Sequence, residues 1–188
     1  MKILVVDDVK YNGILVVTEL QRMGHQVTFV ESGMEGLQAL AKSGNNYELV
    51  VTDLIMPEMD GIALYKNTAN LPQHQGNSLQ TLPPFILLTA STDVDQLIQA
   101  KLVGFSDILL KPLDKIRLNN SIEHILTQRQ TFERTLGQTL ESVREMVTQL
   151  KSRGDLDSAK TTAGYLQVMV SDLFTYIEQE DPDDTFEA

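Results

Sequence analysis

Carboxylate, hydroxyl and amine side chains recur along this sequence where short apolar segments end. They are Asp7, Asp8, Asp53, Thr89 and Lys111. Three carboxylates brought together would repel one another, and a divalent cation among them would offset that repulsion. An all-oxygen, cysteine-free set suits Mg²⁺, which keeps several waters and takes few protein ligands. The lysine and the hydroxyl could donate hydrogen bonds to phosphate oxygens, so these residues indicate phosphoryl transfer onto or off a carboxylate.

Five apolar segments alternate with helical patterns and must position these side chains. Strands are expected at 3–6, 27–30, 49–51, 85–88 and 108–110, with helices at about 12–23, 33–42, 61–69 and 94–103 and a fifth from about 114. Such alternation predicts a parallel sheet with helices on both faces. Ligands of these sheets collect beyond the carboxyl ends of the strands, so the polar side chains should meet at one edge.

The stretch from Leu49 to Gly61 is central to this interpretation. Its apolar start predicts a strand covered on both faces, and Pro57, Asp60 and Gly61 then force a turn. An isolated Asp53 would be read as the cap of the next helix. The polar residues at the other strand ends favour a reactive role instead.

Composition excludes several classes of function. The chain has 188 residues, no cysteine and a net charge of −11. Residues 1–118 hold 9 basic and 13 acidic side chains (−4), and residues 119–188 hold 6 and 13 (−7). Neither half offers the basic face that nucleic acid requires. The apolar start is too short for a membrane span or a signal peptide, and the lack of cysteine fits a reducing cytoplasm.

Residues 1–118 resemble the receiver domain of two-component response regulators. The resemblance is carried by Asp7-Asp8, the stretch from Asp53 to Gly61, Leu88-Thr89-Ala90 and Lys111-Pro112, in order and at the usual intervals. It implies an α/β fold of the flavodoxin-like (βα)₅ type with a five-stranded parallel sheet. It also implies phosphorylation of Asp53 by a sensor histidine kinase or a phosphotransfer protein, which makes the domain a signalling module and not an enzyme.

The resemblance further implies a magnesium site. Asp8 and Asp53 would bind Mg²⁺ directly, together with the backbone carbonyl of Ile55. Asp7 would act mostly through a metal-bound water.

The remaining implied roles concern catalysis and switching. Lys111 would pair with the phosphoryl oxygens and precede Pro112 through a cis peptide bond, while Thr89 would hydrogen-bond to the phosphoryl group and swing inward on activation. Family members usually carry Tyr or Phe three residues before this lysine, where Ile108 stands here. Ile108 is either a neutral core substitution or a sign that the aromatic half of the switch is missing and coupling is altered.

The last seventy residues follow a different pattern. A near-heptad apolar seam runs from Leu118 to Leu150 and predicts an unbroken helix over about 114–151. A second amphipathic helix should start at Asp155 or Asp157, and an acidic tail at 181–188 should be disordered. We therefore expect a helical hairpin at 119–180 that forms a homodimer as a four-helix bundle. The alternative is a hairpin docked within its own chain.

Three other interpretations stay open. The chain could be the regulatory part of a longer enzyme, with a phosphatase or nucleotide cyclase domain missing. It could be a receiver that never takes phosphate, although the complete set of acids argues against that. Finally, His124 could serve a phosphotransfer domain, but it is close to the receiver and flanked by apolar residues.

Overall fold

The computed structural model describes residues 1–42, 47–72, 82–152, 157–158, 160–162 and 164. The chain divides into two compact units, Met1–Ile125 and Leu126–Ala188. Across the described residues, no helix combines the length and the apolar character needed to cross a membrane.

The first unit is built on a five-stranded parallel sheet. Its strands are β1 (Lys2–Val6), β2 (Gln26–Val30), β3 (Leu49–Thr52), β4 (Phe85–Thr89) and β5 (Asp107–Leu110). Their order in space is β2-β1-β3-β4-β5, and every neighbouring pair is parallel. The predicted flavodoxin-like (βα)₅ fold is therefore confirmed.

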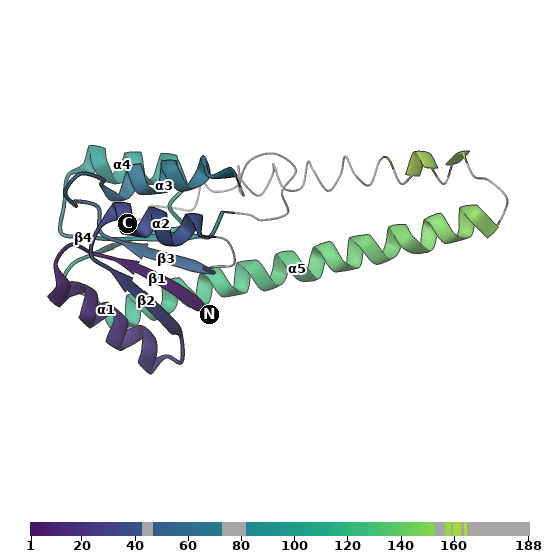
Figure 1. Ribbon diagram of the computed structural model, residues 1–188. Helices are drawn as coiled ribbons and strands as arrows, with labels where there is room; N and C mark the ends of the chain where they lie inside the picture. Colours follow the sequence, from purple (N-terminus) through teal and green to yellow (C-terminus); the bar gives the residue numbers. More distant parts are fainter. Residues whose placement is uncertain (43–46, 73–81, 153–156, 159, 163, 165–188) are drawn as a thin grey trace. The chain divides into compact units, whose positions relative to one another are not determined.

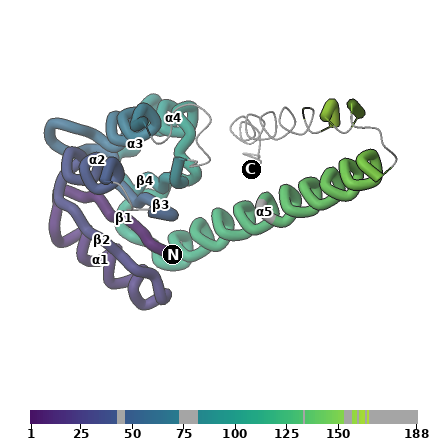
Figure 2. The backbone as a smooth tube through the Cα atoms, turned by 45° about the vertical axis from the view of Figure 1, so that its right-hand side comes forward, coloured from purple at the N-terminus to yellow at the C-terminus, as the bar shows by residue number. Residues whose placement is uncertain are grey.

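Helices cover both faces of this sheet (Figures 1 and 2). They are α1 (Lys10–Arg22), α2 (Gly33–Ala41), α3 (Gly61–Ala69), α4 (Val94–Val103) and α5 (Lys115–Ser152). The helices α2, α3 and α4 lie on one face, while α1 and the first turns of α5 lie on the other. Side-chain caps start four of them: the side chains of Ser32, Asp60, Asp93 and Asp114 accept from backbone amides in the first turns of α2, α3, α4 and α5.

Apolar side chains from the strands fill the space under both helical layers. Successive residues of a strand point to opposite faces, so Leu4 and Val6 face α2 to α4 while Ile3 and Val5 face the other layer. All four are at most 1% exposed. The sheet is buried on both faces, which explains the continuous apolar runs of the sequence.

The long helix α5 begins in the first unit and ends in the second. Its predicted course over about 114–151 without a break is confirmed. Leu118, Ile122 and Ile125 are buried within the first unit. Beyond them a half-buried apolar stripe continues along one side of the helix, made of Phe132, Leu136, Val143, Val147 and Leu150. Leu140, which falls on the spacing of the same seam, is 43% exposed.

Some predictions fall on parts of the chain outside the described residues. These are most of the second helix with the cap at Asp155, and the acidic tail at 181–188. Asp157 and the other described residues up to Gly164 are helical.

Candidate functional site

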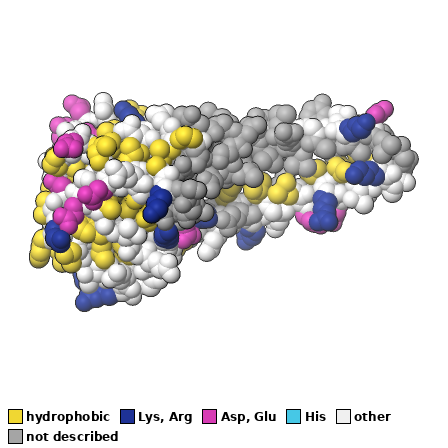
Figure 3. Space-filling model, in the orientation of Figure 1, with side chains coloured by type: hydrophobic (Ala, Val, Ile, Leu, Met, Phe, Trp, Pro, Cys, Tyr) yellow, Lys and Arg dark blue, Asp and Glu magenta, His cyan; other side chains and the backbone are white. Residues whose placement is uncertain are grey.

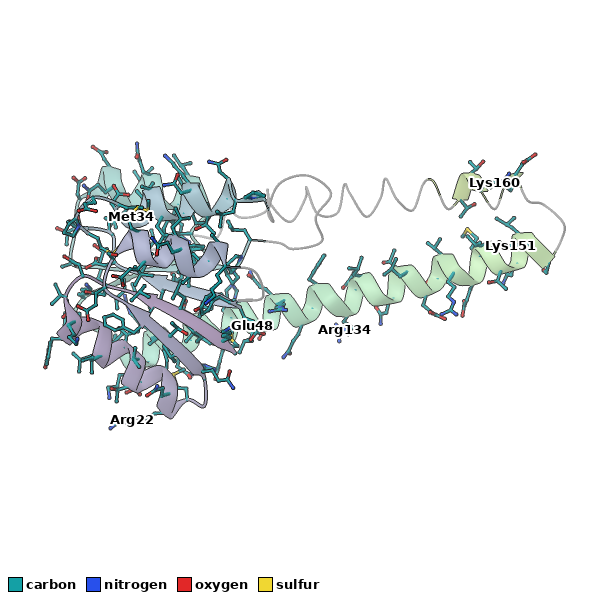
Figure 4. The ribbon with its side chains drawn as sticks, in the orientation of Figure 1. Arg22, Met34, Glu48, Arg134, Lys151 and Lys160 are labelled. Carbon is teal, nitrogen blue, oxygen red and sulfur yellow. The ribbon has the colours of Figure 1, made fainter. Side chains whose placement is uncertain are left out.

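Three carboxylates meet at the edge where β1 and β3 end. Asp7 and Asp8 follow β1, and Asp53 follows β3. The register pairs Val6 with Thr52, and the amide of Asp53 donates to the carbonyl oxygen of Val6 at 2.9 Å. One carboxylate oxygen from each of the three acids lies within 4.8 Å of those of the other two. The cluster lies at the carboxyl ends of the strands, whereas Glu48, labelled in Figure 4, lies at the other end, near the start of β1.

Lys111 joins this cluster from the end of β5. Its Nζ atom donates to Asp7 Oδ2 at 2.8 Å and to Asp53 Oδ2 at 2.5 Å. The three side chains are largely enclosed, with exposed fractions of 13% for Lys111, 3% for Asp7 and 11% for Asp53. The peptide bond between Lys111 and Pro112 is cis.

Burial and charge act against each other on these groups. Burial raises the pKa of Asp7, although its hydrogen bond and attraction to Lys111 work in the opposite direction. Burial by itself would lower the pKa of Lys111, but hydrogen bonds to Asp53 and Asp7 outweigh it, and this pKa is raised. Lys111 is therefore a permanent cation at neutral pH, placed between two acids.

The loop from β3 to α3 is folded tightly against Asp53. The carboxylate of Asp53 accepts from the amide of Leu54 at 2.6 Å, and the amide of Gly61 donates to the carbonyl of Leu54 at 2.9 Å. A Cβ atom on Gly61 would lie 2.4 Å from the carbonyl oxygen of Asp53, so only glycine fits. Ile55 lies in this loop with its side chain 61% exposed.

Thr89 ends β4 and is fully buried. Its backbone carbonyl accepts from the amide of Lys111 at 2.7 Å, and its hydroxyl oxygen accepts from the amide of Ser91 at 3.0 Å. Ile108 is half-buried and packs against the core on the α3–α4 side. Phe105, just before β5, is 3% exposed and packs on the rings of Tyr65 and Phe85.

Comparison with known proteins identifies this arrangement. Residues 3–123 match the response regulator receiver domain. The chain belongs to this family. Its receiver is 30% identical over 126 residues to the two-component response regulator ARR10 of Arabidopsis thaliana, covering 67% of this chain and 21% of that protein. It is 32% identical over 124 residues to the transcriptional regulatory protein ZraR of Salmonella typhimurium, covering 66% and 26%.

Solved structures give the same result. A response regulator receiver domain protein from Clostridium thermocellum superposes with a TM-score of 0.60 at 26% identity, covering 70% of this chain and 98% of that one. The chemotaxis protein CheY4 of Vibrio cholerae gives a TM-score of 0.57 at 26% identity, covering 66% and 97%. The chain spans about a fifth to a quarter of the length of the curated relatives, so the receiver is the shared part.

The receiver site has the composition that a magnesium ion requires. In this family, phosphorylation on an aspartate and dependence on Mg²⁺ are general. The donor set here consists of carboxylate oxygens from Asp7, Asp8 and Asp53, which are the hard ligands that Mg²⁺ prefers. Asp7 and Asp53 share Lys111, whereas no ion pair is recorded for Asp8 among the described residues.

Sequence reasoning missed residues in the neighbouring loops and helix starts that hold the site in place. Ser91 and Asp93 organise the start of α4, and Gly33 lets α2 approach the β3–α3 loop. A signal for the first two was present, because a serine and an aspartate directly before an apolar helical pattern are typical of a helix start. Glycine at residue 33 carries no comparable signal, since the close approach depends on a loop 26 residues away.

Proposed function

We propose that this receiver accepts a phosphoryl group on Asp53 from a sensor histidine kinase or a phosphotransfer protein. The proposal rests on the position of Lys111, whose ammonium donates to both Asp7 and Asp53 at the strand ends. A carboxylate must be ionised to attack phosphorus, and a neighbouring cation favours that form.

In the transfer step, a carboxylate oxygen of Asp53 forms a bond to phosphorus while the bond from phosphorus to the donor's imidazole nitrogen breaks. The electron pair of the broken bond stays on that nitrogen, and the donor histidine leaves. Lys111 then pairs with a phosphoryl oxygen in place of a carboxylate. The hydroxyl of Thr89 turns to donate a hydrogen bond to another phosphoryl oxygen.

The same edge of the sheet would hold the metal. Asp8, Asp53 and the backbone carbonyl of Ile55 would ligate it directly, and Asp7 would act through a bound water. When bound, Mg²⁺ neutralises negative charge on the phosphoryl oxygens during transfer. The loop fixed by Gly61 contains Ile55, which follows Asp53 by two residues, and this nearness in sequence supports a role for its carbonyl.

Incubation with acetyl phosphate and Mg²⁺, followed by intact-mass measurement, tests this function. The wild-type chain should gain one phosphoryl group, and Asp53→Asn should gain none. Asp95→Asn, which removes an exposed acid on α4, serves as the control and should still be phosphorylated. Failure of the wild type to gain mass, or a gain that persists in Asp53→Asn, would contradict the proposal.

For the output we propose a homodimer through residues 119–180. The support is the half-buried apolar stripe of α5, next to which Leu140 and Met146 remain 43% and 52% exposed. Two such hairpins would bury these side chains in a four-helix bundle. In light scattering at micromolar concentration the wild type should have the mass of a dimer. Leu140→Glu should weaken the dimer, whereas the control Ser142→Glu should leave its mass unchanged. A monomeric wild type would favour the intrachain hairpin.

A second candidate is the regulatory part of a longer enzyme, with a phosphatase or nucleotide cyclase as output. The observation in its favour is that the relatives are four to five times as long as the stretch they share with this chain. The mass of the protein in its native host separates the two: a product of 188 residues supports the dimer, and a larger product supports the enzyme.

A further inference from the structure

Strand β2 lies at one edge of the sheet, with β1 as its only neighbouring strand (Figure 1). The amide of Gln26 donates to the carbonyl oxygen of Met1 at 2.9 Å, and the carbonyl of Val30 accepts from the amide of Asp7 at 3.3 Å. In a parallel ladder, every second residue directs its N–H and C=O groups to the neighbouring strand. The even-numbered residues of β2 therefore bond to β1, and the odd-numbered residues turn their backbone groups out of the sheet.

The outward backbone groups belong to Val27 and Phe29. Among the described residues, no hydrogen-bond partner is recorded for their amides or carbonyls. The next outward amides, those of His25 and Glu31, donate within the chain at 3.1 and 3.2 Å. The open stretch of this edge thus consists of two donors and two acceptors, bounded on each side by an amide that already has a partner.

The sequence of β2 does not protect this edge. Natural edge strands usually carry a charge, a proline or a bulge that prevents pairing with another chain. β2 has the sequence Gln-Val-Thr-Phe-Val, pairs with β1 in an unbroken register, and has no fully buried residue. Figure 3 shows apolar and other uncharged side chains around β2 on the visible face. By contrast, β5 at the opposite edge begins with the charged Asp107. β2 is therefore able to accept a further strand.

A second copy of β2 fits this edge when the two strands run antiparallel about a twofold axis at Thr28. Val27 of each copy then lies opposite Phe29 of the other. Such opposite residues exchange two hydrogen bonds, so the two pairs satisfy every outward group of both residues in both copies. The facing side chains also suit each other, because a β-branched residue lies opposite an aromatic one. The same register sets His25 opposite Glu31, so no like charges meet.

We propose that the outer edge of β2 is an interface between two copies of this chain, in which two five-stranded sheets join into one. The interface is separate from the helical hairpin contact proposed above and does not depend on phosphorylation of Asp53. Each copy then has two twofold contacts, one through the hairpin and one through β2. Acting together, the two contacts link dimers into larger assemblies.

The lack of cysteine in the chain allows a direct test by cross-linking. Thr28→Cys places the only thiol at the twofold axis, where opposite Cα atoms lie about 4.5 Å apart and a disulfide can form. Gln26→Cys is the matched control, because this position is more exposed but its two copies lie about 14 Å apart along the strands. Under mild oxidation at submillimolar concentration, Thr28→Cys should form a covalent dimer about tenfold faster than Gln26→Cys, or more. Equal rates, or faster cross-linking of Gln26→Cys, would contradict the interface.

Val27→Pro separates the outward hydrogen bonds from those within the sheet. It removes one outward amide and keeps the bonds to β1, since the nitrogen of residue 27 points away from β1. Combined with Thr28→Cys, it should slow cross-linking by about tenfold or more, the effect of losing two ordinary hydrogen bonds per interface. Val27→Thr keeps the amide and should leave the cross-linking rate unchanged. A proline variant that is folded by circular dichroism and cross-links at the full rate rules the proposal out.

Amide hydrogen exchange in the unaltered chain gives a readout that needs no variant. As protein concentration rises, exchange should slow at Val27 and Phe29 but not at Thr28, whose amide already bonds to β1. Exchange at Val27 and Phe29 that is the same at low and high concentration overturns the interface. Phosphorylation of Asp53 by acetyl phosphate is measured on the same samples by intact mass. Either result can fail without the other, so this inference and the proposed function are tested separately.

Discussion

The ammonium of Lys111 lies 2.8 Å from the carboxylate of Asp7, although 104 residues separate them in the chain. Their contact closes the site, because it joins the end of β5 to the end of β1 across two intervening strands. It also places a cation where the chain concentrates negative charge.

Replacing Lys111 with methionine should therefore lower both the stability of the receiver and its phosphorylation. The buried carboxylates of Asp7 and Asp53 would lose their shared partner, and we expect the free energy of unfolding to fall by about 2–4 kcal/mol. Urea denaturation in EDTA measures this loss, and added Mg²⁺ should recover part of it. Lys101→Met, an exposed lysine on α4, is the control and should change little. Equal effects of the two substitutions would contradict a special role for Lys111.

Asp8 should decide whether Mg²⁺ stabilises the receiver. A ligand that binds only the folded state raises its stability by mass action. The wild type should therefore melt at a higher temperature as Mg²⁺ is added, whereas Asp8→Asn should show no such increase. Without metal, Asp8→Asn should be at least as stable as the wild type, since one of three repelling carboxylates is neutralised. Thermal melts in EDTA and in a Mg²⁺ series measure both effects, and a full Mg²⁺ response in the variant would exclude Asp8 as a ligand.

The positions of the site residues could be predicted because a parallel sheet aligns its strand ends. Once the apolar segments before Asp7, Asp53 and Lys111 were recognised as strands, topology brought their polar neighbours to one edge. The orientation of each side chain was not predictable in this way. That Lys111 contacts Asp7 as well as Asp53 depends on the register and twist of strands far apart in sequence.

The helical seam shows a different limit of sequence reasoning. Spacing of three and four residues from Leu118 to Leu150 predicts one apolar stripe, but not what covers it. The structure buries Leu118, Ile122 and Ile125 within the receiver unit, and the remaining seam lies in the second unit. Sheet-facing and helix-facing stripes have the same period, so the sequence could not separate these two uses.

Gly33→Ala should destabilise the receiver even though alanine is the better helix former. A Cβ atom at residue 33 would lie 2.4 Å from the main-chain carbonyl oxygen of Met59, in the loop that follows Asp53. Backbone must shift to relieve this contact, at a cost of about 1–3 kcal/mol. The urea midpoint of the whole chain measures it. Gly137→Ala is the matched control, because nothing lies within 4 Å of a Cβ there, and it should be neutral or stabilising by up to ~1 kcal/mol.

Ser121→Ala should be neutral or stabilising. Ser121 lies on the same side of α5 as the buried Leu118 and Ile125, is 7% exposed, and its hydroxyl oxygen has no hydrogen-bond partner within the described part of the chain. An unsatisfied buried hydroxyl costs about 1–3 kcal/mol, and its removal recovers part of that cost. Thermal unfolding compares this variant with Ser142→Ala, whose hydroxyl is exposed and donates to the carbonyl of Gln138. A clear loss of stability in Ser121→Ala would show that this hydroxyl is satisfied in solution.

The ion pair between Glu19 and Lys115 should make receiver stability depend on acid pH. Glu19 on α1 lies 2.7 Å from Lys115 at the start of α5. The hydrogen bond from Lys115 lowers the pKa of Glu19 below its ordinary value of 4.5, even though partial burial opposes the shift. A carboxylate with a lowered pKa in the folded state contributes stability above its unfolded pKa and loses it as pH falls through the folded pKa. Urea unfolding from pH 6 down to about pH 3 should therefore show a shallower decline in Glu19→Gln than in the wild type. The decline of stability with pH in Lys115→Met should match that in Glu19→Gln, and the double variant should show no further change. Parallel stability curves for all four proteins would mean that the ion pair contributes nothing in solution.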